Sequence, residues 1–125
     1  MPVDIKVIRT RDFIKSTSKG VLDLASSKQA LVDIISQIKQ PGEYELLVDT
    51  REAESGLSVA DIFELGITLA NQFPLRRSKI GLLTPMSEAD NAIFFETVAR
   101  NRGVNIRAFT DFEQAITWLV MKQES

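Results

Sequence analysis

The sequence predicts an α/β protein with a five-stranded mixed, mostly parallel sheet, an N-terminal antiparallel hairpin and four helices, in a single domain over residues 1–125. Three observations favour this fold. Strand-like and helix-like segments alternate along the chain, as they do in parallel sheets with helical crossovers. Hydrophobic residues make up 44% of the 125 residues, which is enough for a buried core. Two apolar runs, YELLVD and KIGLLT, are typical of strands buried on both faces.

The first forty residues predict a hairpin followed by a helix. Residues 4–9 and 12–18 alternate, imperfectly, between apolar and polar side chains, which indicates two antiparallel strands. We expect Lys19-Gly20 to end the second strand. A helix is expected over residues 24–39, because apolar side chains recur on one of its faces, Asp23 can cap its start and a Pro-Gly pair stops it.

The middle of the chain predicts a buried strand, a polar loop and a strongly apolar helix. The strand covers residues 44–49 and the loop covers residues 50–57. Ser58 is expected to cap the helix together with Asp61 in a capping box. Apolar side chains occupy most of this helix's circumference, which predicts deep burial or a partner surface. Gly66 lies within the apolar arc and permits another backbone to approach closely.

Two further strand and helix pairs complete the predicted fold. In the third helix Ile93 points away from the apolar face, so we expect it to be exposed. In the last helix we expect Phe112 to pack inward and Trp118 to act as a packing anchor. The predicted elements are a strand over 79–84, a helix capped by Ser87 and ended by Gly103, a strand over 105–109, and a helix over 112–121 capped by Asp111.

The composition excludes several classes of chemistry. The chain has no cysteine, which removes disulfides, thiolate metal sites and a cysteine nucleophile. It has no histidine either, and histidine is the commonest general base and metal ligand. It carries no glycine-rich phosphate loop and no nucleophile motif. We therefore expect a protein that is not an enzyme and that has no catalytic residues, no cofactor and no metal.

Charge and hydropathy limit the kinds of partner and the cellular location that we expect. The formal net charge is −2, and residues 41–75 are strongly acidic. Nucleic-acid phosphates require lysine and arginine, so we expect no nucleic-acid partner. No stretch approaches the roughly 20 apolar residues of a membrane helix. We therefore expect no membrane span and a cytoplasmic location.

Polar residues follow the predicted central strands, where open parallel sheets bind their ligands. Asp49, Arg51 and Glu52 come after the third strand, and Thr84 ends the fourth. An Asp and a Thr so placed also occur in phosphoacceptor receiver domains. A receiver domain, however, needs an acidic pair after its first strand and a lysine at the end of its last, and this sequence has neither. Any catalysis would have to rely on Asp49, Arg51 or Glu52.

Three segments resemble the STAS superfamily, and in particular the stage II sporulation protein AA-like proteins and the related lipid-carrier-like STAS/SEC14 group. The segments are YELLVD at residues 44–49, KIGLLT at 79–84 and RAFTDFEQAITWL at 107–119. The resemblance implies a five-stranded mixed sheet with four helices, no cofactor and no catalysis. Anti-anti-sigma members carry a phosphorylatable serine before a helix, and residues 54–58 of this chain, ESGLS, stand in the comparable place without the family's Asp-Ser pair.

Two functions compete on this basis. The first is a non-catalytic binding or regulatory module that acts through protein–protein contact, with an unidentified protein partner or as a homodimer. Its contact residues would lie on the second and third helices: Phe63, Ile67, Ile93 and Phe95. The second is a carrier or sensor of a small apolar ligand or lipid. A carrier requires a cavity of several hundred Å³, whereas an interaction module is packed solid.

The predicted loop of residues 50–58 is the expected functional rim. Ser58 is a candidate regulatory residue because a phosphate is tolerated at a helix N-terminus. Ser55 is a candidate by its position in the resemblance. Acidic neighbours such as Glu54 and Asp61 oppose an added phosphate on either serine. The alternative is that Ser58 only caps the helix and that Ser55 is an ordinary loop residue.

Overall fold

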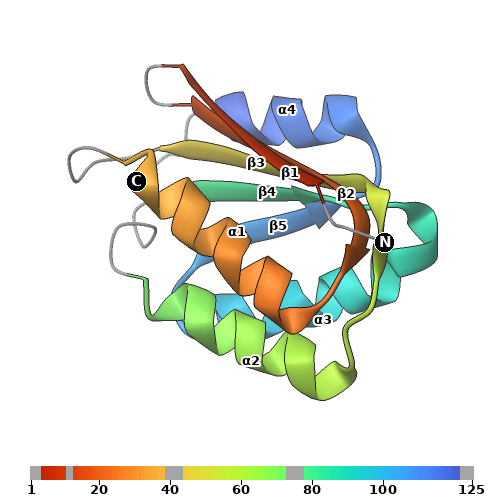
Figure 1. The fold of residues 1–125 in the computed structure, drawn as a ribbon. Helices are drawn as coiled ribbons and strands as arrows, with labels where there is room; N and C mark the ends of the chain where they lie inside the picture. The colour runs from red at the N-terminus through yellow and green to blue at the C-terminus, as the bar shows by residue number, and fades with distance from the viewer. Residues whose placement is uncertain (1–3, 11–12, 39–43, 73–77, 122–125) are drawn as a thin grey trace.

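The computed structural model describes residues 4–10, 13–38, 44–72 and 78–121 (Figure 1). The α/β class and the four helices predicted from the sequence are confirmed. The elements in chain order are β1 (Asp4–Thr10), β2 (Phe13–Leu22), α1 (Leu24–Ser36), β3 (Glu45–Ser55), α2 (Val59–Ala70), β4 (Lys79–Leu83), the short 3-10 helix η2 (Met86–Glu88), α3 (Ala89–Arg100), β5 (Asn105–Phe109) and α4 (Phe112–Val120).

The strands lie in one sheet in the order β1-β2-β3-β4-β5. β1 pairs with β2 in antiparallel fashion, and β2 to β5 are parallel to one another. Helices α1, α2 and α3 cover one face of the sheet, and α4 covers part of the other (Figure 1). The first three helices each follow a parallel strand, so they all begin at the edge where those strands end. Ligands of open α/β sheets bind at this edge.

Successive residues of the central strands face opposite layers of the protein. Leu46 belongs to the core beneath α1, α2 and α3, whereas its neighbour Leu47 packs against α4 with Trp118 and Leu119. Trp118 is buried, and its ring centroid lies 5.7 Å from that of Phe109. The prediction that Trp118 is a packing anchor is confirmed.

β2 and β3 extend beyond the rest of the sheet as a two-stranded ribbon. β4 ends at Leu83, which lies opposite Asp49, but β3 continues to Ser55, which pairs with Leu22. The register of β2 against β3 shifts between Thr17 and Lys19, at the start of the extension. Irregularities of this kind bend a strand pair and increase its twist. The ribbon curves toward the helices of the first face (Figure 1).

This ribbon corrects two sequence predictions. Residues 50–55 are strand and not the first part of a loop, and β2 continues through Lys19-Gly20 to Leu22. The physical reason is that a two-stranded ribbon outside the main sheet exposes most of its side chains to water. Its residues are therefore polar, like those of a loop. Gly20 has a φ of 89°, which suits a glycine at a distortion in a strand.

Three helices begin with the caps that the sequence predicts. Asp23 accepts a hydrogen bond from the first turn of α1, and Ser58 and Asp61 form the predicted capping box of α2. Asp111 caps α4. Side-chain caps satisfy backbone N–H groups that have no partner within the helix.

The start of α3 and the end of α1 differ from the predictions. Ser87 does not cap α3, because residues 86–88 form η2 after Pro85, and Glu88 occupies the N-cap position without a side-chain capping bond. A 3-10 turn of this kind often precedes an α-helix. The helix expected over residues 24–39 ends at Ser36, and residue 39 lies outside the described residues.

Gly66 is the point of closest approach between α2 and α3. A Cβ atom built at Gly66 would lie 2.5 Å from Cγ1 of Val98, well inside van der Waals contact. The close approach predicted at Gly66 is present, but the neighbouring element is α3, whereas packing on the sheet was the favoured expectation. The rest of α2 is less buried than expected, because Val59 is 67% exposed and Phe63 is 43% exposed. Within the described residues, no helix has the length and apolarity that crossing a membrane requires.

Candidate functional site

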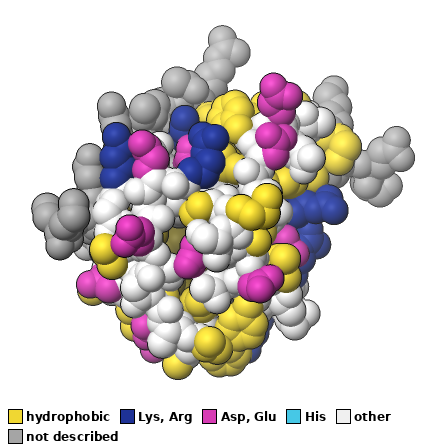
Figure 2. Space-filling view, turned by 90° about the vertical axis from the view of Figure 1, so that its right-hand side faces the viewer, with side chains coloured by type: hydrophobic (Ala, Val, Ile, Leu, Met, Phe, Trp, Pro, Cys, Tyr) yellow, Lys and Arg dark blue, Asp and Glu magenta, His cyan; other side chains and the backbone are white. Residues whose placement is uncertain are grey.

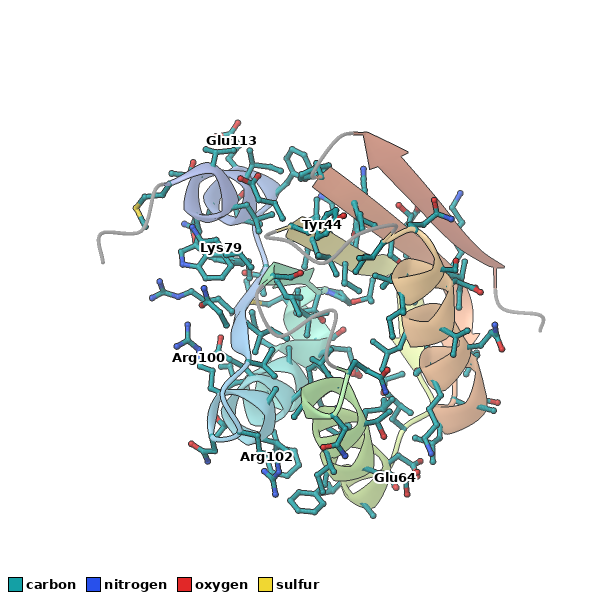
Figure 3. The ribbon with its side chains drawn as sticks, turned by 90° about the vertical axis from the view of Figure 1, so that its left-hand side faces the viewer. Tyr44, Glu64, Lys79, Arg100, Arg102 and Glu113 are labelled. Carbon is teal, nitrogen blue, oxygen red and sulfur yellow. The ribbon has the colours of Figure 1, made fainter. Side chains whose placement is uncertain are left out.

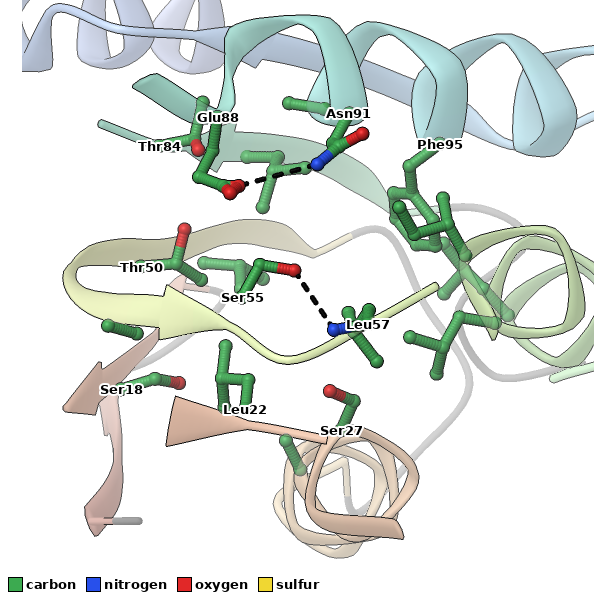
Figure 4. Close-up of a pocket in the computed structure, with 18 of the residues that line it drawn as sticks. Ser18, Leu22, Ser27, Thr50, Ser55, Leu57, Thr84, Glu88, Asn91 and Phe95 are labelled. Carbon is green, nitrogen blue, oxygen red and sulfur yellow. Dashed lines mark hydrogen bonds between the residues drawn. The ribbon is translucent and has the colours of Figure 1, made fainter. Parts of the chain in front are cut away.

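An apolar pocket lies between the sheet and the helices α1, α2 and α3 (Figure 4). Its volume is about 170 Å³. Buried core side chains form its inner end, among them Ile34, Leu46, Leu69 and Ile80. Ser55, at the end of β3, lies at its outer end. The pocket is therefore at the edge of the sheet where α/β proteins bind ligands.

Small side chains create the space for this pocket. Ser18 on β2, Ala53 on β3, Ala30 on α1 and Ala92 on α3 all line it. Protein interiors are packed so closely that voids larger than a water molecule are few. A dry cavity of about 150 Å³ is known to bind a molecule the size of benzene, so this pocket can hold several carbon atoms.

The β2–β3 ribbon supplies the outer wall of the pocket. Leu22, Ala53 and Ser55 line the pocket from the ribbon. The backbone N–H of Gly56 donates a hydrogen bond of 2.7 Å to the carbonyl of Leu22. This bond holds the chain between β3 and α2 against β2. The segment that looks like a loop in sequence is thus a structured wall of the site.

Polar side chains gather at the mouth of the pocket. Figure 4 shows Ser55, Thr84, Glu88 and Asn91 around one opening. The Asn91 side chain donates to the Glu88 carboxylate at 3.4 Å, and the Leu57 backbone N–H donates to Oγ of Ser55 at 3.2 Å. The first bond is longer than an ordinary hydrogen bond, and the second is at the upper end of the normal range. Ser55 accepts its bond, so its hydroxyl hydrogen is not used there, and the Glu88 carboxylate has acceptor sites beyond the one that faces Asn91.

Asp49 and Arg51 lie on the opposite face of the sheet from the pocket, and they form a closely paired unit. Nε and one terminal nitrogen of Arg51 donate to the two carboxylate oxygens of Asp49 at 3.0 and 2.9 Å. The Asp49 side chain is almost fully buried. Burial alone raises the pKa of Asp49, but the hydrogen bonds and charge of Arg51 outweigh it and hold this pKa below its ordinary value. The hydrogen bonds that Arg51 donates to Asp49 in turn raise the pKa of Arg51.

Phe112 lies beside this pair, between two cations. The guanidinium carbon of Arg51 is 5.5 Å from the ring centroid of Phe112, and Nζ of Lys15 is 5.8 Å from it. The prediction that Phe112 packs inward is wrong, because its side chain is 38% exposed. Phe112 is the first residue of α4, and its ring faces the charged ends of the two basic side chains.

The residues that the sequence predicts at one rim therefore lie on two different faces of the sheet. Thr84 faces the pocket, whereas Asp49 and Arg51 face α4. Thr50 lines the pocket, whereas its neighbours Asp49 and Arg51 do not, because neighbouring residues of a strand point to opposite faces of the sheet. Ser55 lines the pocket mouth.

The predicted contact residues of α2 and α3 are also divided. Phe95 is half-buried and lines the pocket, so it is not part of an outer surface. Phe63 is exposed on α2, and the guanidinium carbon of Arg102 lies 5.3 Å from its ring centroid. Ile67 is half-buried, and Ile93 is 55% exposed, as the sequence predicts.

Sequence reasoning missed Glu88 and Asn91 as residues of the site. Both are brought to the mouth by η2 and the first turn of α3, and the sequence gives no motif for them. A signal for the pocket itself was present. Inward positions of the strands and helices carry serine or alanine, as at Ser18 and Ala92, where a filled core would carry larger residues.

The lining of the site is mostly apolar, with a few polar groups. Acidic side chains do not gather in threes anywhere in the described ranges, so these offer no ready cage for a metal ion. The pocket is lined by aliphatic side chains, hydroxyls, two carboxylates and an amide. Its polar groups stand at the mouth, where they can orient one end of an apolar molecule.

Comparisons with known proteins bear on the fold. No protein-family model matches the chain, and no curated protein sequence matches it at a significant level. Among the solved structures, a crystal structure of an uncharacterized DUF3478-family protein from Shewanella loihica PV-4, described as having a SpoIIAA-like fold, matches with a TM-score of 0.57 and 17% identity. The match covers 94% of this chain and 93% of that one. This chain therefore has the SpoIIAA-like fold that its sequence resemblance implies.

Proposed function

We propose that this protein is a cytoplasmic, non-catalytic binding module that holds a small aliphatic ligand in the pocket between the sheet and α1, α2 and α3. The observation that carries the proposal is the apolar space of about 170 Å³ that opens at the carboxyl ends of the strands. The sequence alone favours a protein-interaction module over a ligand carrier. The pocket is smaller than the several hundred Å³ expected of a lipid carrier, but it is larger than the voids of an interior that is packed solid, and this supports a binding site for a smaller ligand.

The size of the pocket limits the ligand. Pockets for drug-sized molecules have volumes of roughly 300 to 1,000 Å³. A space of about 170 Å³ accommodates an alkyl chain of about six to eight carbons and excludes a lipid with two long chains. The proposal therefore concerns a short-chain molecule or the end of one longer chain, and not a whole membrane lipid.

A series of straight-chain alcohols tests the proposal by calorimetric titration. Each buried methylene contributes about 0.8 kcal/mol, so affinity should rise about fourfold per carbon from butanol upward. We expect the increase to stop near eight carbons, when the pocket is full. An affinity that rises without a break to decanol, or no binding at all, contradicts the proposal.

A matched pair of substitutions locates the binding. Ala92→Leu adds three carbons to a buried side chain that lines the pocket, and should move the limit to a shorter chain. Ala60→Leu adds the same three carbons at an exposed position of α2 and should leave the limit unchanged. Thermal unfolding of both variants without ligand shows whether each retains its fold.

A second function is favoured by the exposed apolar side chains of α2. Val59 and Phe63 are four residues apart, so they share one face of the helix, and Ile67 continues that line. This stripe suits contact with an unidentified protein partner or a second copy of the chain. Sedimentation velocity of the wild type and of Phe63→Ser is the test. A wild-type protein that stays monomeric at high micromolar concentration removes the homodimer.

A further inference from the structure

The residues at the mouth of the pocket also indicate which polar group the ligand has at its end. We propose that this end is an ammonium group or, with lower affinity, a hydroxyl, and that the site rejects carboxylates and phosphates. This inference rests on the proposed function, since it concerns the same pocket. It derives from the charges and hydrogen-bonding groups around the opening.

The groups that line the mouth are a carboxylate, hydroxyls and the Asn91 amide, whose N–H group already donates to Glu88. Glu54 and Glu88 are carboxylates that line the pocket, and Ser55 and Thr84 contribute hydroxyl oxygens. The Thr84 hydroxyl is 3.5 Å from its nearest recorded acceptor, the carbonyl of Pro85, so this bond is weak. Within the described part of the chain, the lining of the pocket includes no lysine or arginine.

The N-termini of three helices at the same end of the protein contribute positive charge, which would favour an anionic ligand. α1, α2 and α3 each begin here, and each contributes roughly half a positive charge. These ends already carry acidic side chains. Asp23 caps α1, Asp61 belongs to the capping box of α2, and Glu88 and Asp90 stand at the start of α3. With Glu54 included, the full negative charges outnumber the partial positive ones.

Two of the described lysines near this end are already paired with glutamates. Lys28, next to the pocket residue Ser27, forms an ion pair with Glu64. Lys19 is 3.8 Å from Glu52. Figure 2, which views this end of the molecule, shows acidic side chains over much of the face, and basic ones in its upper part and at its right-hand edge. Among the described residues, an anionic ligand would thus meet carboxylates, while Lys19 and Lys28 are already paired with glutamates.

An ammonium matches this mouth better than an uncharged group does. It brings three N–H donors, and the mouth offers the Glu88 carboxylate together with the oxygens of Ser55 and Thr84 as acceptors. A hydroxyl can make hydrogen bonds with the same groups but gains no attraction between charges. A carboxylate brings only acceptors and is repelled by Glu88.

Titration with octylamine, octanol and octanoate at pH 7.5, below the concentration at which micelles form, tests the inference. The three molecules share one chain length, so differences in affinity report on the polar end. We expect octylamine to bind about three to five times more tightly than octanol, which is the range of a partly exposed ion pair. Octanoate should bind at least about threefold more weakly than octanol.

Two carboxylate variants show whether the preference arises at the mouth. Glu88→Gln should bring the affinity for octylamine close to that for octanol and should improve the affinity for octanoate relative to octanol. Glu113→Gln removes an exposed carboxylate from α4, on the other face of the sheet, and should change none of the three. Higher salt should weaken the amine preference through screening.

The outcomes separate this inference from the proposed function. If octanol binds and octanoate binds as tightly as octylamine, the inference is wrong and the proposed function stands. If none of the three binds, the proposed function fails as well. If Glu113→Gln reduces the amine preference as much as Glu88→Gln does, the preference comes from the overall charge of the protein, and the inference is wrong.

Discussion

At the scale of single residues, Asp49 shows how one buried charge depends on its partner. The carboxylate is 6% exposed and receives three hydrogen bonds from Arg51, two from the guanidinium and one from the backbone N–H. Removing the guanidinium leaves a buried charge with one local donor, and unpaired buried charges are costly. Because the Arg51 side chain is 43% exposed, solvent screens part of the interaction.

We expect Arg51→Gln to lower the free energy of unfolding by about 1 to 2 kcal/mol at pH 7, measured by urea denaturation. Lys19→Gln is the control, because its pair with Glu52 is exposed on both sides and should contribute less than about 0.5 kcal/mol. Equal effects of the two substitutions would show that the burial of Asp49 has no energetic consequence.

The same pair predicts a dependence of stability on pH. The pKa of Asp49 is lower in the folded protein than its ordinary value, so its contribution is fully present above about pH 4 and is lost as the pH falls through the folded pKa. In Arg51→Gln the guanidinium no longer offsets the effect of burial on the pKa of Asp49, so this pKa should be higher than in the wild type. The loss of stability in acid should therefore begin at a higher pH. Unfolding curves between pH 2 and 6 measure the shift between the two proteins.

The two candidate serines differ in their structural roles. Ser58 accepts a hydrogen bond of 3.1 Å from the backbone N–H of Asp61, whereas Ser55 accepts only a local bond from Leu57. Ser58→Ala should therefore cost about 1 kcal/mol of unfolding free energy, and Ser55→Ala should cost close to none. Chemical denaturation of the two variants compares them directly. A costly Ser55→Ala would give that hydroxyl a structural role that its contacts do not explain.

At the scale of elements, the contact between α2 and α3 depends on Gly66. Alanine favours a helix over glycine by about 1 kcal/mol, but a Cβ at this position would overlap Val98. We expect Gly66→Ala to destabilise the protein by about 1 to 3 kcal/mol, because overpacking outweighs helix propensity.

A double-mutant cycle with Val98→Ala tests the cause of that effect. Shortening Val98 removes the overlapping Cγ1 atom, so the combined cost should be at least about 1 kcal/mol below the sum of the single costs. Strictly additive costs would show that Gly66 is required for another reason, such as the conformation of the helix.

Lys79 connects β4 to α4 from beneath the helix (Figure 3). Its Nζ donates to the carbonyls of Trp118 and Met121 and lies 4.7 Å from the Trp118 ring centroid. These carbonyls lie at the end of α4, where no N–H of the helix reaches them. Burial lowers the pKa of Lys79. Lys79 thus provides hydrogen bonds to the carbonyls at the end of α4, at the cost of removing its ammonium group from water.

We expect Lys79→Met to lower the free energy of unfolding by about 1 to 3 kcal/mol at pH 7, since two carbonyls lose a charged donor. The pKa of Lys79 is lower in the folded protein than in the unfolded chain, so its contribution to stability should improve as the pH rises toward about 10.4. Lys79→Met should lack this improvement. Lys28→Met, at an exposed pair, is the control.

The elements also show which features of this sequence are predictable. β5 was predicted with its observed bounds, and the caps at Asp23, Ser58 and Asp111 follow from local chemistry that a sequence displays directly. The extension of β3 to Ser55 was not predicted, because its only strand partner there is β2. Pairing between distant segments is a property of the fold and leaves no local signal in polar residues.

At the scale of the whole molecule, the candidate site is where prediction from sequence was least complete. Ser55 and Phe95 are candidate site residues in the sequence, and both line the pocket. The sequence points to Ser55 by its position in the family resemblance and to Phe95 as a surface contact, and neither reason concerns a pocket. Glu88 and Asn91 reach the mouth through η2, which the sequence did not predict. A pocket arises from the sum of many inward side chains on several elements, so no short motif marks it.

The most direct test of the central claim locates the ligand by methyl NMR during a titration with octanol. The pocket predicts saturable shifts, with one dissociation constant, in the methyl groups of Ile34, Leu69 and Ile80, which line its inner end. The methyl groups of Leu119, in the core beneath α4, should remain unchanged. Shifts that do not saturate, or that appear at Leu119 and not at the pocket residues, would contradict the account.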